Sequence, residues 1–266
     1  MNLAIDLFLD YRLDRPQPVL LAVEAADAQG QSVTRATLTV EGAALRRFAG
    51  EAGVGTRLWA HGPDERMRLR YRAGVTVARA TEALEGMEAA PMDTLPPEVL
   101  SFLRPSRLCP SDTGAVAELV AARFSTGDGG ARLAAIRDWV GAEIAYRPAA
   151  SHAATTACDT IAAGAGVCRD FAHVVCTLAR AAGVPARYAS VYAPGVTPPD
   201  FHAVAEVWLD GAWRLVDATG MSAPGDTVLI GVGRDACDVP FMETEFDAAP
   251  VSQVVSVQAA GPSGAE

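Results

Sequence analysis

The stretch Gly164-Ala165-Gly166-Val167-Cys168-Arg169-Asp170-Phe171-Ala172-His173 reads as the start of a buried helix. Beyond it, apolar residues recur at spacings of three and four, which marks one face of a helix, until Gly183 and Pro185 end it. Cys168 would therefore lie in the first helical turn, where free backbone N–H groups and the positive end of the helix dipole favour a thiolate. Taken alone, the pattern is equally typical of a small buried cysteine.

A second informative stretch is FHAVAEVWLDGAWRLVD, residues 201–217, which predicts a β-hairpin. Its two β-type runs are separated by Asp210-Gly211, the strongest short-range hairpin signal. With these as the two loop residues, Asp217 faces Val204, and His202 points to the same face as Val204. An imidazole and a carboxylate are thus expected side by side on adjacent strands. Together with the cysteine at the helix start, they are the parts of a thiol-based catalytic triad.

These segments resemble the catalytic core of the transglutaminase-like superfamily, in particular its bacterial branch of transglutaminase-like cysteine proteases. The resemblance is carried by GAGVCRDFAH, LARAAGVPARYASVY and DFHAVAEVWLDGAWRLVDATG, and it extends over residues 103–257. It implies that Cys168 is the nucleophile, that His202 is the base, and that Asp217 orients the base. One departure is Ala218, where the family often has proline after the aspartate, but the carboxylate itself is retained.

The expected fold class is α+β with two domains. Residues 1–80 contain repeated β-type runs separated by turn signals, which predicts a β-sandwich-like N-terminal domain. Residues 81–102 form a connector whose prolines forbid a long helix. The resemblance implies that residues 103–257 form a transglutaminase-like (papain-like) core, in which the nucleophile helix packs on an antiparallel sheet. We expect residues 251–257 to close that sheet, and residues 258–266 to be a flexible tail.

The remaining elements of the core follow from hydrophobic spacing and turn residues. Helical spacing is present in two segments before the nucleophile loop, a short helical turn follows them, and two further runs are rich in β-type residues. The sequence therefore predicts helices over 114–124 and 129–143, a turn of helix over 156–161, and strands over 186–192 and 227–232.

Composition excludes several classes of function. The net charge is −10 and all 22 cationic residues are arginine without a basic run, so nucleic acid and anionic membranes are poor partners. No apolar stretch is long enough to span a bilayer, and residues 1–11 lack the basic region of a signal peptide. Five cysteines, an odd number without Cys-x-x-Cys spacing, predict reduced thiols and a cytoplasmic location.

No metal or cofactor is expected. A zinc site built from Cys168, Cys176, His173 and His202 would match no closed tetrahedral spacing. His173 is five residues beyond Cys168, about 140° around the helix, and so is not expected to act as the base. The only partner that the sequence predicts is a peptide or protein substrate, and the oligomeric state is left open.

The favoured hypothesis is acyl transfer through a thioester at Cys168, on a peptide or carboxamide bond. The backbone N–H of Cys168 is one expected oxyanion donor, and Tyr146 is the candidate for the second. Water as acceptor would make the protein a protease or amidase, whereas an amine would make it a cross-linking enzyme. The residues do not separate these outcomes, and the resemblance to the bacterial branch favours hydrolysis.

Two alternatives belong to other classes. An arylamine N-acetyltransferase uses cysteine, histidine and aspartate in the same order, but its coenzyme A would need a basic phosphate-binding cluster that the sequence lacks. A non-catalytic, peptide-binding transglutaminase-like domain would have no need of all three residues. The identity of the substrate and the role of the N-terminal domain are not determined by these patterns.

Overall fold

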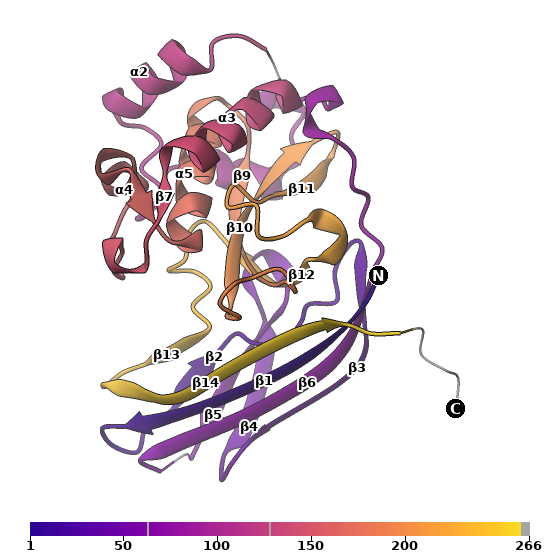
Figure 1. The fold of residues 1–266 in the computed structure, drawn as a ribbon, viewed down its shortest axis with the longest axis vertical. Helices are drawn as coiled ribbons and strands as arrows, with labels where there is room; N and C mark the ends of the chain where they lie inside the picture. Colours follow the sequence, from indigo (N-terminus) through magenta and orange to yellow (C-terminus); the bar gives the residue numbers. More distant parts are fainter. Residues whose placement is uncertain (63, 128, 262–266) are drawn as a thin grey trace.

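The computed structural model describes residues 1–62, 64–127 and 129–261, and it has the expected α+β architecture (Figure 1). Two antiparallel sheets pack as a β-sandwich at one end of the molecule, and a third sheet with its helices forms the other end. Within the described ranges, no helix combines the length and the apolar composition needed to cross a bilayer.

The β-sandwich is formed by two four-stranded sheets. The first has the order β14-β1-β6-β3, formed by Ala248–Ala259, Asn2–Leu13, Arg66–Val77 and Gln31–Val40. The second has the order β13-β2-β5-β4, formed by Met242–Thr244, Val19–Leu21, Thr56–His61 and Ala44–Ala49. Alternate residues of β1 and β6, such as Leu7 and Leu69, are fully buried because successive side chains of a strand point to opposite faces.

The pairing of the last strands corrects one sequence-based expectation. Residues 251–257 were expected to close the sheet of the core, but β14 instead pairs with β1 over nearly its full length, from Leu3 opposite Ala259 to Leu13 opposite Ala248. Alternation of apolar and polar residues identifies a strand with one buried face, but it does not show which other strand it pairs with. The expected tail is also shorter, because residues 258 and 259 belong to β14, while 262–266 lie outside the described residues.

The third sheet carries the segments that the sequence singled out. Its order is β11-β10-β9-β12, formed by Ala212–Val216, His202–Leu209, Ala186–Tyr192 and Val228–Gly233. Helix α5 (Cys168–Ala181) packs against β9 and β10. Around α5 lie α2, α3 and α4, formed by Gly114–Arg123, Gly129–Glu143 and Ala157–Ala163. These bounds agree with the helices and strands expected from hydrophobic spacing.

The connector is packed onto the core as a series of short helical turns. These are 3-10 turns at Leu84–Gly86, Met92–Thr94 and Ser101–Leu103, with α1 at Pro97–Leu100. Leu84 is buried against the start of α3, where a Cβ atom at Gly130 would lie 1.6 Å from the Leu84 carbonyl oxygen. Phe102 packs edge-on against Trp213, with ring centroids 5.3 Å apart. The missing side chain of Gly130 therefore allows α3 to begin directly against Leu84 of the connector.

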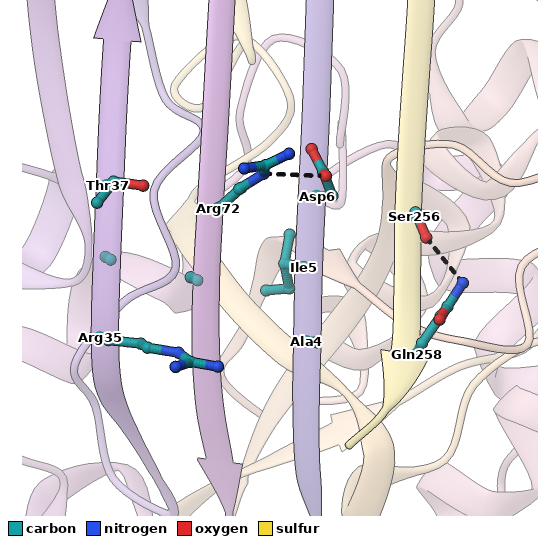
Figure 2. A pocket seen from close by; sticks show the side chains of 10 residues that line it. Ala4, Ile5, Asp6, Arg35, Thr37, Arg72, Ser256 and Gln258 are labelled. Atoms are coloured by element: carbon teal, nitrogen blue, oxygen red, sulfur yellow. Dashed lines mark hydrogen bonds and ion pairs between the residues drawn. The ribbon is translucent and has the colours of Figure 1, made fainter. Parts of the chain in front are cut away.

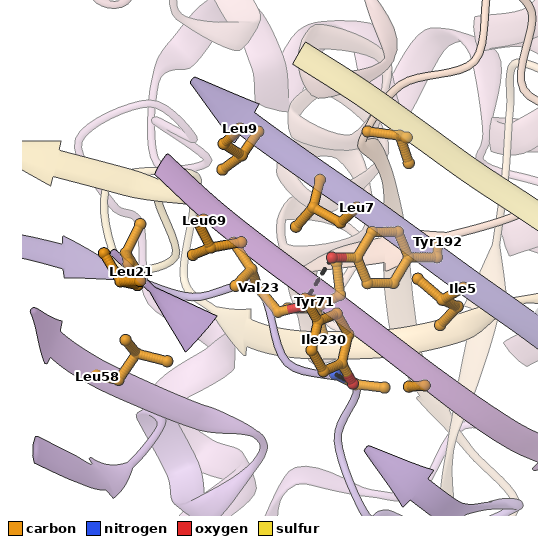
Figure 3. Close-up of a cluster of buried hydrophobic side chains, with 14 of the residues drawn as sticks. Ile5, Leu7, Leu9, Leu21, Val23, Leu58, Leu69, Tyr71, Tyr192 and Ile230 are labelled. Carbon is orange, nitrogen blue, oxygen red and sulfur yellow. Dashed lines mark hydrogen bonds between the residues drawn. The ribbon is translucent and has the colours of Figure 1, made fainter. Parts of the chain in front are cut away.

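A continuous apolar cluster joins the β-sandwich to the third sheet (Figure 3). Tyr192 of β9 and Ile230 of β12 are buried among side chains of the first sheet, such as Ile5 and Leu7. The Tyr192 hydroxyl donates a hydrogen bond of 2.7 Å to the carbonyl oxygen of Val23. The two ends of the molecule thus share buried surface, and their division at residues 80 and 103 stays a prediction.

We expect limited proteolysis to cut the connector first, at its exposed residues 80–83, and to leave two fragments that stay together. Separating them would expose Tyr192 and Ile230 and unpair β14 from β1, at a cost of about 25 cal/mol per Å² of apolar surface. The nicked protein should elute as one species in size-exclusion chromatography and separate only in denaturant. Fragments that elute apart in native buffer would contradict the shared core.

Candidate active site

The loop before α5 places Cys168 at the first position of the helix. Helix α4 ends at Gly164, which has a left-handed φ of 59° that favours glycine. At Gly166, a Cβ atom would lie 2.7 Å from the Cβ of Asp170, so a side chain there would collide with that buried aspartate. Asp170 in turn accepts a hydrogen bond of 2.8 Å from the backbone N–H of Val167 and so holds the helix start in place.

The hairpin of β10 and β11 has the predicted register. Asp210 and Gly211 both have positive φ values, 49° and 67°, as a two-residue type I′ turn requires. Leu209 faces Ala212, and the same register places the residue after β11, Asp217, diagonally opposite His202. The turn therefore brings together two side chains that are fifteen positions apart in sequence.

Asp217 is held by a dense set of hydrogen bonds. Its Oδ2 lies 2.8 Å from Nε2 of His202 and accepts bonds from the backbone N–H (2.9 Å) and hydroxyl (2.8 Å) of Ser222. Its Oδ1 accepts from the backbone N–H (2.8 Å) and hydroxyl (2.6 Å) of Thr219. Burial disfavours the charge on Asp217, but these bonds outweigh it and lower the pKa of the carboxyl group. Thr219 and Ser222 were not anticipated from the sequence, although both follow the aspartate within five residues.

His202 has a strongly raised pKa. Burial disfavours its charged form, but the hydrogen bond to Asp217, the charge of Asp217 and the nearby Cys168 outweigh the burial and raise the pKa of the imidazole to about 9. Because Nε2 is taken by Asp217, Nδ1 is the ring nitrogen left for the thiol. Nδ1 is buried and makes no hydrogen bond of normal geometry to the described residues. The carboxylate thus holds the ring and leaves one nitrogen for Cys168.

Tyr146 lies beside Cys168 because two very short strands pair in parallel. Strand β7 (Ala145–Tyr146) bonds to β8 (Ala165–Gly166), so Tyr146 is next to the residues that precede Cys168. Its phenol lies close to the thiol of Cys168. Partial burial and the nearby thiol raise the pKa of Tyr146 to about 12, so the phenol keeps its proton at neutral pH.

Other candidates from the sequence lie outside this arrangement. His173 is fully buried within α5, its Nε2 accepts a hydrogen bond of 3.1 Å from the backbone N–H of Ala236, and burial lowers its pKa to about 3. It is therefore a neutral residue of the packed interior. Among the residues that the structure describes, no group of three or more His, Cys, Asp or Glu side chains is arranged to hold a metal ion.

The β-sandwich braces the segment that leads into His202. Asp200 ends the loop before β10, and its Oδ1 accepts hydrogen bonds from the backbone N–H of Phe201 (2.7 Å) and from Nε2 of Gln253 (2.6 Å). Gln253 belongs to β14, and its Oε1 accepts from the hydroxyl of Tyr11 at 2.8 Å. The contact between Asp200 and Gln253 depends on the pairing of β14 with β1. It was not predicted from the sequence, because β14 was expected in the other sheet.

A separate hollow of about 490 Å³ lies on the outer face of the first sheet (Figure 2). Arg35 and Arg72 flank it, and the guanidinium of Arg72 donates a 3.1 Å hydrogen bond to Asp6. Its lining comes from β1, β3, β6 and β14, none of which carries Cys168, His202 or Asp217.

We expect mild iodoacetamide at neutral pH to label Cys168 before the other cysteines. Burial raises the pKa of Cys109 to about 11 and also raises that of Cys176, whereas partial burial and the Asp235 carboxylate raise the pKa of the exposed Cys237, so these thiols are poorly ionised. Cys158 is half-buried and serves as the internal comparison. Peptide mapping by mass spectrometry over time measures the order. Uniform labelling, or labelling of Cys168 last, would contradict its activation.

Comparisons with known proteins bear on the family and the fold of this chain. Residues 119–218, which include Cys168, His202 and Asp217, match the family model of the transglutaminase-like superfamily. An uncharacterized protein of Mycobacterium leprae is 29% identical over 109 residues. The match spans 38% of this chain and 39% of that protein. The crystal structure of a "putative cysteine protease" from Cytophaga hutchinsonii superposes with a TM-score of 0.89 at 28% identity, covering 100% of this chain and 92% of that one. The resemblance and the transglutaminase-like fold inferred from the sequence are thus confirmed.

Proposed function

From the transglutaminase-like domain in residues 119–218, we propose that this chain is a cysteine-dependent acyl-transfer enzyme that hydrolyses peptide or carboxamide bonds. The observation that carries the proposal is the 2.8 Å contact between His202 and Asp217, which leaves Nδ1 of the imidazole for the thiol of Cys168. A nucleophile, a base and a group that orients the base are the three parts that thiol-based acyl transfer needs.

In the proposed first half-reaction, the thiol proton of Cys168 first passes to Nδ1 of His202, whose raised pKa favours the imidazolium, and the sulfur then attacks the carbonyl carbon. A C–S bond forms, and the carbonyl electron pair moves to oxygen, which the backbone N–H of Cys168 stabilises at the helix start. The tetrahedral intermediate then collapses, the C–N bond breaks, and the imidazolium donates its proton to the departing amine. The product is a thioester on Cys168.

In the second half-reaction, water attacks the thioester and His202 again takes the proton. The C–O bond forms, the C–S bond breaks, and the thiolate of Cys168 leaves and recovers its proton. Asp217 stays ionised throughout because its hydrogen bonds lower the pKa of the carboxyl group. The same hydrogen bonds hold the carboxylate in one orientation. Its part is to fix the imidazole and to stabilise the imidazolium.

Tyr146 is the proposed second oxyanion donor. The pairing of β7 with β8 places its phenol beside Cys168, and its raised pKa keeps the donor proton in place. We expect Tyr146→Phe to lower kcat by about 10²-fold with a small change in KM, because a donor that acts in the transition state is lost. Steady-state kinetics measure the split. A change confined to KM would instead assign the phenol to substrate binding.

The proposed substrate is a peptide or protein, and the proposed location is the cytoplasm. All five cysteines lie within the described residues and each is free, which suits a compartment that keeps thiols reduced. Nucleic acid and anionic membranes are not proposed as partners, because the chain is acidic.

Capture of the thioester tests the function directly. The full chain is incubated with a library of peptide amides, quenched in acid and examined by intact-mass and peptide mapping, which should place an acyl group on Cys168. Cys168→Ala should carry no adduct and show no turnover, whereas Cys158→Ala should behave as wild type. An acyl group found on another residue, or turnover that survives Cys168→Ala, would refute the proposal.

A further inference from the structure

A cavity of about 820 Å³ lies against the third sheet, and the catalytic proposal makes no use of it. The connector, through Val99 and Phe102, forms one wall, and loops of the β-sandwich near residues 27–30 and 52–54 form another. Strands β9, β10 and β11 contribute Arg187, Glu206 and Trp213. Cavities of several hundred Å³ at the junction of two structural units are the usual location of small-molecule sites.

The sheet wall of this cavity carries a buried ion pair. The Nε of Arg187 donates a 2.7 Å hydrogen bond to Oε2 of Glu206, and the two side chains are only 7% and 5% exposed. The guanidinium lies over the ring of Trp213, 4.1 Å from its centroid, and 5.9 Å from the ring of Phe102. The aromatic rings and the ion pair hold Arg187 in a single orientation against the cavity.

The ion pair has hydrogen-bonding capacity left over. Within the described residues, neither Nη1 nor Nη2 of Arg187 has a hydrogen-bond partner, and Oε1 of Glu206 has none. None of these atoms is fully enclosed, and both side chains line the cavity, so the atoms are accessible from it. The wall therefore presents N–H donors and a carboxylate acceptor side by side, on side chains that are more than nine-tenths buried.

The charges around the cavity balance. Three arginines and three acidic residues line it, namely Arg79, Arg187, Arg214, Asp27, Glu98 and Glu206. A ligand with a net charge would be desolvated in a cavity whose own charges sum to zero, which is costly. A neutral ligand with an acceptor and a donor on one functional group could accept from Arg187 and donate to Glu206 at the same time. An amide group has this arrangement, and an aromatic or apolar body would fit against Trp213, Phe102 and Val99.

We propose that this cavity is a binding site for a small neutral ligand, in which a primary or cyclic amide pairs with Arg187 and Glu206 and an aromatic or apolar body packs against Trp213. The site is formed by both ends of the molecule and by the connector, so the ligand would bridge them. The proposal is independent of the catalytic chemistry of Cys168.

Benzamide is the probe, with benzoate and benzylamine as charged compounds of similar shape. Each is titrated into the full-length Cys168→Ala variant, which cannot turn over an amide at position 168, and binding is measured by saturation-transfer NMR. Benzamide should bind at least tenfold more tightly than either charged compound. Wild-type protein alkylated at Cys168 should show the same affinity, whereas loss of binding on alkylation would place the probe in the catalytic cleft and overturn the proposal.

Two variants locate the bound probe. Arg187→Met/Glu206→Leu replaces both charges with apolar groups of similar size, which buried ion pairs often tolerate, and should remove the tenfold preference for benzamide. Ala212→Phe leaves the pair intact and fills the cavity from β11, so it should abolish binding. If the double variant does not fold, Ala212→Phe decides by itself. Unchanged binding in a folded variant, or equal binding of the three probes, would refute the site.

Discussion

Replacing Asp217 by Asn is expected to lower turnover by about three to four orders of magnitude while the fold is retained. Asparagine keeps an oxygen that can accept from Thr219, but its amide group would present N–H rather than oxygen to Nε2 of His202. The imidazole would then carry its proton on Nδ1, the nitrogen needed to accept the proton of Cys168. Steady-state kinetics with a peptide amide measure the loss.

The same substitution at Asp210 provides a matched control. Asp210 lies at the tip of the same hairpin with a positive φ that asparagine tolerates well, and its Oδ1 acceptor for the backbone N–H of Glu88 would be kept. Asp210→Asn should therefore leave turnover unchanged. Near-normal turnover in Asp217→Asn would show that the triad is wrongly assigned.

The pH dependence of Asp217→Asn has a definite sign. In the wild type, the raised pKa of His202, about 9, keeps the imidazolium available as the acid for the leaving amine, so acylation should decline as pH rises through 9. Loss of the Asp217 carboxylate removes a main cause of the raised pKa, and the decline should move to lower pH. The contribution of the raised pKa of His202 to folding stability is present in full below pH 6.5 and is lost as pH rises through about 9. Thermal unfolding should show this loss in the wild type and less of it in the variant.

Replacing His202 by Ala is expected to have the larger effect, a loss of about four to six orders of magnitude in kcat, because one residue serves as base in both half-reactions and as acid in the first. Alkylation of Cys168 should also slow, because the sulfur loses the positive charge of the neighbouring imidazolium. Folding should persist, since Asp217 keeps its bonds to Thr219 and Ser222.

Kinetics and the rate of iodoacetamide labelling measure these two effects of His202→Ala independently. His61→Ala, at an exposed position on β5, is the control and should change neither. If His202→Ala lost turnover but labelled at the wild-type rate, the histidine would act on the substrate alone and not on the thiol.

Much of the candidate site was predictable because short-range rules govern it. Helical spacing placed Cys168 at a helix start, and Asp210-Gly211 set the register that brings Asp217 to His202. Tyr146 was a weaker inference from the sequence, since the pairing of β7 with β8 that positions it involves only two residues on each strand.

The amino-acid sequence alone therefore determined the helix that begins at Cys168, the hairpin of β10 and β11 and the α+β class, since each depends on residues close together in the chain. Only the tertiary structure decided that β14 pairs with β1 and that Gln253 braces Asp200. It also decided that Arg187 and Glu206 face a cavity closed by the connector. These contacts join segments far apart in sequence, and alternation shows which face of a strand is buried but not which surface buries it.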